Sequence, residues 1–366
     1  MQWLWKHKQY QEWLSTNASN LLLIEGKPGS GKSTLAKYFK CNLLERDSLA
    51  EQSIVASFFY SYREGELQTD HSNMLRSILY DILTQNETFF FHFQTYYRQA
   101  LQPGTRLQWP YKSLKSILKS IGEHPTEERL YLIIDAMDES DDTDRRNIIQ
   151  LLRQICLGKT SCKMKIFLTS RPVAGLSHRS TETKLIRLQD ENEQDILNFA
   201  RSFLGPELEL PSDILHQATD YIVTHAQGVF IWVHLVKQVL LSYSECGATK
   251  KEIFDYLKSI PTELKDFYKR IVKELERREQ RDIEDGKKMF RLVLFAYRPL
   301  SLEEFRHALA IPDDLHAEFL PCDRSFEAEL ILGISKRIIH CGGNFLEVKG
   351  VPGALLPSNA LLELLG

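Results

Sequence analysis

The chain has 366 residues, more than one small hydrophobic core commonly serves, which predicts two or three domains. Its 46 basic and 49 acidic residues nearly cancel, so composition supplies no overall field that would attract nucleic acid or an anionic membrane. The 6 cysteines form no C-x-x-C pair and are expected to be free thiols. No apolar run reaches the ~20 residues that cross a bilayer. We therefore expect a cytoplasmic protein without a nucleic-acid or membrane partner.

The N-terminal half alternates strand-like and helix-like segments, the pattern of a parallel sheet that is covered by helices. A lead-in helix is expected within residues 1–18, where Trp5, Tyr10 and Trp13 are apolar positions. The five strands are predicted at 21–25, 54–60, 130–135, 165–169 and 184–188. Helices are expected at 33–44, 73–84, 88–101 and 111–121. The fold class is thus α/β, with a five-stranded parallel sheet in a domain over residues 19–190.

The first strand leads directly into G-K-P-G-S-G-K-S, the complete P-loop pattern G-x-x-x-x-G-K-[ST]. A polyphosphate needs several backbone N–H groups that converge on it, and glycines let the loop fold that tightly. Lys32 offers a positive charge to the terminal phosphates, the Ser33 hydroxyl can ligate Mg²⁺, and the N-terminus of the next helix favours an anion. The predicted nucleotide-binding residues are Gly26, Lys27, Pro28, Gly29, Ser30, Gly31, Lys32, Ser33 and Thr34.

The third strand ends in the acidic cluster D-A-M-D-E-S, which has the character of a Walker B element. Ligands of a doubly wound sheet lie at the carboxyl ends of its strands, so Asp135 is predicted to face Ser33 and to hold Mg²⁺ through a water molecule. Asp138 or Glu139 would then orient or deprotonate the attacking water, and the sequence leaves open which of the two does so.

The fourth strand runs into S-R-P at residues 170–172. From that edge Arg171 would point at the γ-phosphate, where it could report the nucleotide state. A salt bridge to a nearby acid is nearly as good an interpretation of this arginine. The predicted catalytic residues are therefore Asp138, Glu139 and Arg171, and the predicted metal ligands are Ser33 and Asp135.

After residue 190 the alternation stops and helices follow one another. Helices predicted at 193–204, 212–224, 229–243 and 250–259 form an all-helical domain over residues 191–260. Pro261 marks a hinge, because the residue before a proline is pushed out of the helical conformation. A third unit over 261–340 has predicted helices at 263–278, 288–297 and 302–310, the last one opened by a capping box of Ser301 and Glu304. The tail, residues 341–366, does not continue the preceding pattern.

Together these blocks resemble the NACHT-type signal-transduction NTPases (STAND) of the fungal-type NOD-like receptor group, also grouped as nephrocystin-3-like N-terminal domains. The resemblance covers residues 2–349 and its last block resembles the start of a winged-helix domain, so the third unit is expected to be a partial winged-helix domain. The matching blocks are Q-W-L and E-W-L in the lead-in segment, the P-loop, A-S-F-F-Y-S, residues 75–83, D-A-M-D-E-S, T-S-R-P, G-V-F-I-W-V and R-P-L-S-L-E-E-F.

The resemblance implies a switch that holds ADP when closed, exchanges it for ATP on sensing a ligand, and oligomerises to activate an effector. It implies ATP or ADP with Mg²⁺ as cofactors, and effector proteins, other receptor chains or further copies of this chain as partners. The family's winged-helix histidine should follow Val348, where this chain reads K-G-V-P-G-A-L-L-P-S-N-A. Gly228 at the start of a helix is a candidate contact to the base. We expect a trimmed receptor, or a module that acts with other chains.

Two functions stay open on this evidence. The first is an ATP-binding signal-transduction NTPase with slow, Mg-dependent hydrolysis, which would make the protein a weak ATPase. The second is a nucleotide-binding interaction scaffold, or a receptor fragment, without useful turnover. A small-molecule kinase is disfavoured because a long helical region follows the sheet, where a kinase needs only a short lid. A DNA-remodelling ATPase is disfavoured by the net charge and the lack of a basic stripe.

Overall fold

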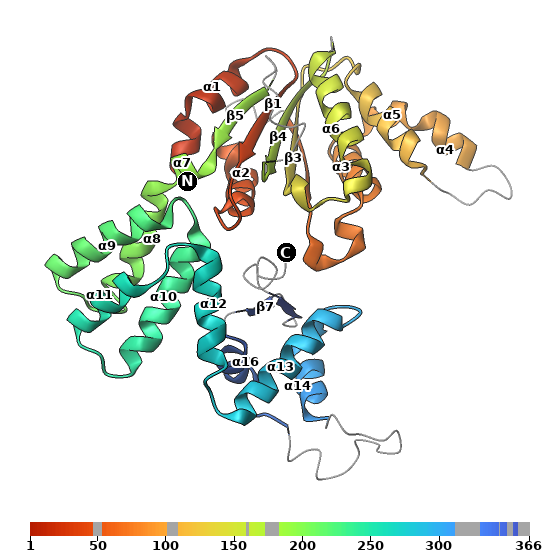
Figure 1. The fold of residues 1–366 in the computed structure, drawn as a ribbon. Helices are drawn as coiled ribbons and strands as arrows, with labels where there is room; N and C mark the ends of the chain where they lie inside the picture. Colours follow the sequence, from red (N-terminus) through yellow and green to blue (C-terminus); the bar gives the residue numbers. More distant parts are fainter. Residues whose placement is uncertain are drawn as a thin grey trace, which may run out of the picture. The chain divides into compact units, whose positions relative to one another are not determined.

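A computed structural model describes residues 1–46, 53–100, 109–158, 161–172, 183–311, 330–343, 345–349 and 354–357 (Figure 1). The chain divides into two compact units. The first consists of Met1–Phe199 and Gln227–Phe230, and the second of Ala200–Ala226 and Ile231–Gly366. The chain therefore enters the first unit twice.

The first unit is built on a five-stranded sheet in which every neighbouring pair is parallel, in the order β2-β3-β4-β1-β5. Its strands are β1 (Asn20–Glu25), β2 (Ser53–Phe59), β3 (Arg129–Asp135), β4 (Lys163–Ser170) and β5 (Thr183–Arg187). The predicted α/β class and the five parallel strands are confirmed. Because β4 lies between β1 and β3, it separates the strand before the P-loop from the strand that carries the acidic cluster.

Helices cover both faces of this sheet (Figure 1). On one face lie η1 (Gln2–Lys6), α1 (Lys8–Ser15) and α2 (Lys32–Arg46), and on the other lie α3 (His71–Gln85), α5 (Tyr111–Ile121) and α6 (Asp142–Leu157). A hydrophobic core lies on each face of the sheet, and successive residues of β3 pack into the two cores in turn. Tyr131 and Ile133 pack with the first set of helices, whereas Leu130 and Leu132 pack with the second. A sheet that is buried on both faces explains why its strands read as continuous apolar runs.

Short elements complete the first unit. The helix predicted at 88–101 is divided into a 3-10 helix and an α-helix, and the side chain of Asn86 caps the first of them by accepting from the Thr88 N–H. The short elements are η3 (Tyr62–Glu64), η4 (Glu66–Gln68), η5 (Glu87–His92), α4 (Gln94–Ala100), η6 (Met137–Glu139), α7 (Leu188–Glu191) and α8 (Glu193–Leu204), the last of which continues into the second unit.

The second unit combines helices with a small antiparallel sheet of strand order β6-β8-β7. The capping box predicted for Ser301 and Glu304 is present at the start of α14. Part of the predicted tail supplies two strands of the small sheet. The elements are α9 (Ser212–Ala226), α10 (Phe230–Glu245), α11 (Lys250–Ser259), α12 (Leu264–Leu275), α13 (Gln280–Phe295), β6 (Leu300–Ser301), α14 (Leu302–Ala310), α16 (Ile334–Gly342), β7 (Leu346–Lys349) and β8 (Ala354–Pro357).

The helix α13 begins eight residues before the start that we predicted at 288, and its first half contains the buried residue Gly286. A Cβ atom at Gly286 would lie 2.8 Å from the carbonyl oxygen of Cys341 on α16, so the two helices approach closely there. Charged residues flank Gly286 in the sequence, so the sequence pattern does not indicate a buried helix contact at this position.

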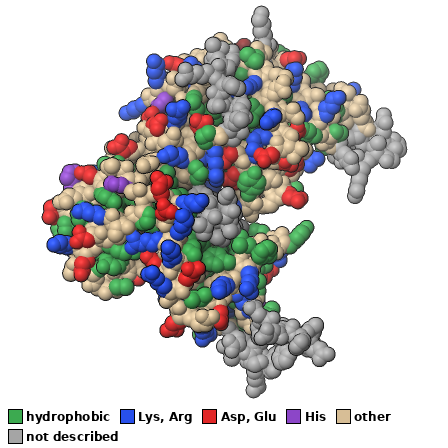
Figure 2. All heavy atoms as spheres, viewed as in Figure 1, with side chains coloured by type: hydrophobic (Ala, Val, Ile, Leu, Met, Phe, Trp, Pro, Cys, Tyr) green, Lys and Arg blue, Asp and Glu red, His purple; other side chains and the backbone are tan. Residues whose placement is uncertain are grey.

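The cysteines within the described ranges are free thiols, as expected. Across the same ranges, the helices are all too short or too polar to pass through a lipid bilayer. Basic and acidic side chains are interspersed over the face that Figure 2 shows.

A buried lysine fastens the lead-in segment to the sheet. Lys165 on β4 is fully buried, and its Nζ donates to the carbonyls of Trp13 (2.7 Å) and Thr16 (2.6 Å) and to Oδ1 of Asn20 (3.1 Å). The two carbonyls belong to the C-terminal end of α1, where helix acceptors lack intrahelical partners and the helix dipole favours a cation. The carbonyl groups at the end of α1 thus stabilise the positive charge of the buried Lys165 ammonium group.

Replacing Lys165 by Met should lower the free energy of unfolding of the first unit by about 2–4 kcal/mol, because the carbonyls of Trp13 and Thr16 and Oδ1 of Asn20 would each lose a charged donor. Urea denaturation followed by tryptophan fluorescence measures this change. Lys163→Met, at the half-buried start of the same strand, is the control and should change stability by less than about 0.5 kcal/mol. Equal effects of the two substitutions would contradict the role assigned to Lys165.

Candidate functional site

The P-loop joins β1 to α2, and backbone hydrogen bonds hold it at its start and within the loop. The N–H of Gly26 donates to the carbonyl of Ser170 at the end of β4 (3.2 Å), and the N–H of Ser30 donates to the carbonyl of Lys27 within the loop (3.2 Å). Gly31 has a φ angle of 93°, a conformation that residues with a side chain rarely adopt. The predicted residues Ser33 and Thr34 follow in the exposed first turn of α2.

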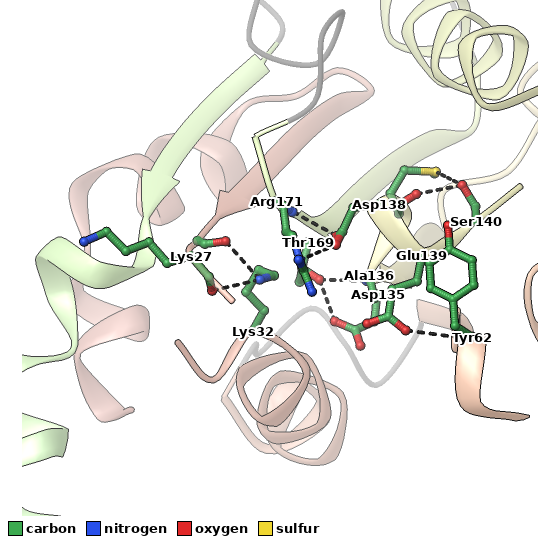
Figure 3. A network of polar contacts seen from close by, with 12 residues as sticks. Lys27, Lys32, Tyr62, Asp135, Ala136, Asp138, Glu139, Ser140, Thr169 and Arg171 are labelled. Atoms are coloured by element: carbon green, nitrogen blue, oxygen red, sulfur yellow. Dashed lines mark hydrogen bonds and ion pairs between the residues drawn. The ribbon is translucent and has the colours of Figure 1, made fainter. Parts of the chain in front are cut away.

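Lys32, the first residue of α2, folds its side chain back over the loop (Figure 3). Its Nζ donates to the carbonyls of Gly26 (2.9 Å) and Lys27 (3.1 Å). Burial lowers the pKa of this ammonium group, and the negative charge of Asp138 acts in the opposite direction. Hydrogen bonds to neutral carbonyls are weaker than those to an anion, so the lysine is available to a phosphate group.

Asp135 lies at the end of β3, is only 2% exposed, and is surrounded by hydroxyl groups. The hydroxyl of Thr169 donates to Oδ1 of Asp135 (2.5 Å) and accepts from the N–H of Ala136 (2.9 Å). Burial raises the pKa of Asp135, and the hydrogen bond from Thr169 and the neighbouring hydroxyl of Ser33 oppose that rise. The two residues predicted as metal ligands, Ser33 and Asp135, therefore lie near each other.

A strained turn directs the next two acids away from the strand. Ala136 has φ 52° and ψ 49°, the left-handed region, which a residue with a Cβ atom seldom occupies. Its N–H is held by Thr169, and its carbonyl accepts from the N–H of Glu139 (2.8 Å). Strain of this kind persists only where the surroundings enforce it, and it clusters at functional sites. The short helix η6 that follows carries Asp138 and Glu139.

Asp138 and Arg171 form an ion pair across the carboxyl ends of β3 and β4 (Figure 3). Nε of Arg171 lies 3.0 Å from Oδ2 of Asp138, and the backbone N–H of Arg171 donates to Oδ1 (2.9 Å). The Asp138 side chain is 11% exposed, whereas that of Arg171 is 44% exposed. In this state the arginine makes the salt bridge that the sequence left as an alternative to a phosphate contact.

Glu139 has a different environment from Asp138, although both belong to η6. Its Oε2 accepts the backbone N–H of Tyr62 (3.2 Å). Burial raises the pKa of Glu139, the bond from Tyr62 lowers it, and the charge of Asp138 adds to the rise. A carboxyl group with a raised pKa is closer to the value that suits proton transfer at neutral pH.

One residue at the site carries no sequence signal. Asn192 lies between α7 and α8, is 1% exposed, and donates from Nδ2 to the carbonyls of Ser30 (3.1 Å) and Gly228 (2.8 Å). A single asparagine among acidic residues matches no motif. The ring of Phe230 also reaches the loop, at 3.4 Å from the place that a Cβ atom of Gly31 would take. Residues 227–230, which include the candidate base contact Gly228, thus pack beside the P-loop.

Comparison by sequence finds two matches. Residues 1–171 match the family described as nephrocystin 3, N-terminal. The chain is also 27% identical over 323 residues to the vegetative incompatibility protein HET-E-1 of Podospora anserina, a match that covers 86% of this chain. The chain spans 23% of the length of that relative.

Comparison by structure finds distant neighbours. One is a STAND protein with a tetratricopeptide-repeat sensor from Pyrococcus horikoshii, with a TM-score of 0.42, 13% identity, and coverage of 95% of this chain and 40% of that chain. Another is the ORC2 protein of Aeropyrum pernix in its ADP form, with a TM-score of 0.39, 12% identity, and coverage of 96% and 87%.

Replacing Asp135 by Asn should raise the free energy of unfolding of the nucleotide-free protein at pH 7 by on the order of 1 kcal/mol, because it removes a buried charge whose hydrogen-bond donor within the described residues is the neutral hydroxyl of Thr169. A raised pKa in the folded state means that the wild type loses stability as the pH rises through the pKa of this carboxyl group. The gain should therefore shrink as the pH is lowered towards 4, as measured by thermal unfolding. Asp255→Asn on α11, an exposed position, is the control. An unchanged or lower stability of Asp135→Asn at pH 7 would contradict this account.

Proposed function

We propose that the chain is a NACHT-like P-loop NTPase related to the STAND proteins, and that it is a nucleotide-dependent switch that binds ATP and ADP with Mg²⁺ and hydrolyses ATP slowly. One observation carries the proposal. Lys32, Ser33 and the buried Asp135 converge beside a P-loop whose backbone is already folded. That arrangement is the charge pattern that a metal-bound polyphosphate would complement.

The donor atoms at this point suit Mg²⁺. The Ser33 hydroxyl and the Asp135 carboxylate are hard oxygen ligands, and Ser33 lies near enough to Asp135 to lower the pKa of its carboxyl group. Magnesium commonly takes one or two protein oxygens and completes its shell with water and phosphate. When bound, the ion would neutralise charge on the terminal phosphates. Within the described residues no lysine or arginine forms an ion pair with Asp135, so a divalent cation would be its natural counter-charge.

The roles of the chain's own residues follow from their contacts. The loop N–H groups and the N-terminus of α2 would bind the phosphates. Lys32 would exchange its two carbonyl acceptors for phosphate oxygens, which are better partners for a cation. Glu139 would orient the attacking water, because its carboxyl group accepts a backbone hydrogen bond whereas Asp138 is paired with Arg171.

Slow turnover is proposed from the state of Arg171. An arginine aimed at the γ-phosphate stabilises the charge that develops in phosphoryl transfer. Here the guanidinium group is neutralised by Asp138 and must leave it before it can act. The same observation favours a second candidate, a nucleotide-binding scaffold without turnover, in which this ion pair never opens.

Signalling is proposed from the similarity to HET-E-1, which is named as a vegetative incompatibility protein. We propose that nucleotide exchange controls contacts with effector proteins, with other receptor chains or with further copies of this chain, in the cytoplasm. A switch of this kind requires contacts that differ between its nucleotide states.

Nucleotide occupancy tests the binding site. We expect the purified protein to release ADP or ATP on denaturation, as identified by chromatography and mass spectrometry. Lys32→Ala should remove the phosphate contact and leave less than about a tenth of that occupancy. Lys37→Ala, at an exposed position on the same helix, should retain it. Equal occupancy of both variants would contradict the proposed site.

Turnover separates the two candidate functions. Glu139→Gln should lower the rate of ATP hydrolysis at least about 100-fold, since it removes a group that can accept a proton. It should change the affinity for ATP less than about threefold, because the role proposed for it is toward water. Asp138→Asn is the matched comparison. If it alone abolishes turnover, the roles of the two acids are reversed. If the wild type never hydrolyses ATP, the scaffold is the correct function.

A further inference from the structure

The amide of Asn192 connects two carbonyl groups that are remote in the sequence. Its Nδ2 donates to the carbonyl of Ser30 in the P-loop and to that of Gly228, at 3.1 and 2.8 Å. Both partners are acceptors only, so the amide nitrogen must face both of them, and this fixes the orientation of the side chain. Asn192 is buried, so water cannot replace these hydrogen bonds and breaking them would cost free energy.

The first of these bonds orients the P-loop. A peptide unit is planar and trans, so its C=O and N–H groups point in opposite directions. Holding the carbonyl of Ser30 against Asn192 therefore turns the N–H of Gly31 away from Asn192. The amide of Asn192 thus sets the direction of one of the donors that the loop can offer to a phosphate group.

The second bond holds a short segment, Gln227–Phe230, which we call the strap. At Gly228 the φ angle is 80°, and a Cβ atom would lie 2.5 to 2.7 Å from atoms of Gln189, so the strap lies directly on α7. The strap belongs to the first unit, whereas the residues on both sides of it in the chain belong to the second unit. Any shift of the strap is therefore passed covalently to the end of α9 and to the start of α10.

Two buried polar atoms at the contact between Asn192 and the P-loop can still form hydrogen bonds. The hydroxyl of Ser30 and Oδ1 of Asn192 are buried, and neither has a hydrogen-bond partner among the residues that the structure describes. Buried polar atoms are rarely left without one. These two groups are therefore free to accept a new hydrogen-bond partner if the loop changes its conformation.

We propose that Asn192 is a positioning residue that couples the P-loop to the strap, so that nucleotide binding at the loop changes the strap and the start of α10. The proposal rests on the proposed function, because it requires that the P-loop binds nucleotide. It assigns the coupling to the two bonds donated by Nδ2, and not to the packing of the side chain.

Hydrogen exchange in the full chain, with and without MgADP, tests the coupling. In the wild type, MgADP should slow exchange both in the P-loop and in the strap. In Asn192→Ala, protection should remain in the P-loop and disappear from the strap, and the affinity for ADP should fall roughly 3- to 10-fold. Asn192→Asp keeps the shape but removes both donors, so it should behave like Asn192→Ala. Asn198→Ala, at an exposed position on α8, should behave like the wild type.

The possible outcomes distinguish the two proposals. If the wild type does not bind MgADP, the proposed function fails, and the coupling fails with it. If both Asn192 variants bind MgADP and still protect the strap, the coupling is wrong while the proposed function stands. If Asn192→Asp retains protection that Asn192→Ala loses, packing carries the coupling and the assignment to the two bonds is overturned. A structural role alone would change thermal stability equally with and without ADP, and would leave the protection of the strap intact.

Discussion

The C-terminal end of β4 supports both halves of the site. The carbonyl of Ser170 accepts the N–H of Gly26, where the P-loop begins, and the hydroxyl of Thr169 holds Asp135 and the strained Ala136 on the neighbouring strand. Both contacts are possible because β4 lies between β1 and β3. The chain then continues into Arg171, which meets Asp138. A single strand end thus sets the spacing between the phosphate loop, the acidic cluster and the arginine.

Two charged side chains at the centre of the site, Asp135 and Lys32, form hydrogen bonds with neutral groups. Asp135 is buried among hydroxyl groups, and Lys32 donates to neutral carbonyls. Each would gain an oppositely charged partner from a metal-bound polyphosphate, so binding would relieve the cost of burying both charges. A ligand that binds only the folded state stabilises it in proportion to the logarithm of its concentration. Folding of the first unit and occupancy of the P-loop are therefore linked through these two residues.

Local features of the site could be predicted from the sequence, and remote ones could not. The P-loop and the five strands depend on residues that are neighbours in the chain, so spacing and apolar runs reveal them. Strand order depends on pairing between distant segments, and Asn192 meets Ser30 across 162 positions, so neither leaves a local pattern. The sequence likewise does not distinguish a phosphate contact from a salt bridge for Arg171, because Asp138 lies 33 positions away in the chain. The strands β7 and β8 were not predicted, because their hydrogen bonds come from pairing with each other and with β6.

A switch needs a contact that differs between nucleotide states, and the sequence after Val348 lacks the histidine that the resemblance would supply for it. The strap offers a different location for such a contact. It lies within the first unit, beside the P-loop, and yet it is continuous with α10, which runs into the second unit. Coupling through Asn192 would need only the end of α7, the P-loop and four residues of the strap. A nucleotide signal could therefore leave the P-loop by way of the backbone at Gly228, without any contribution from the residues that follow Val348.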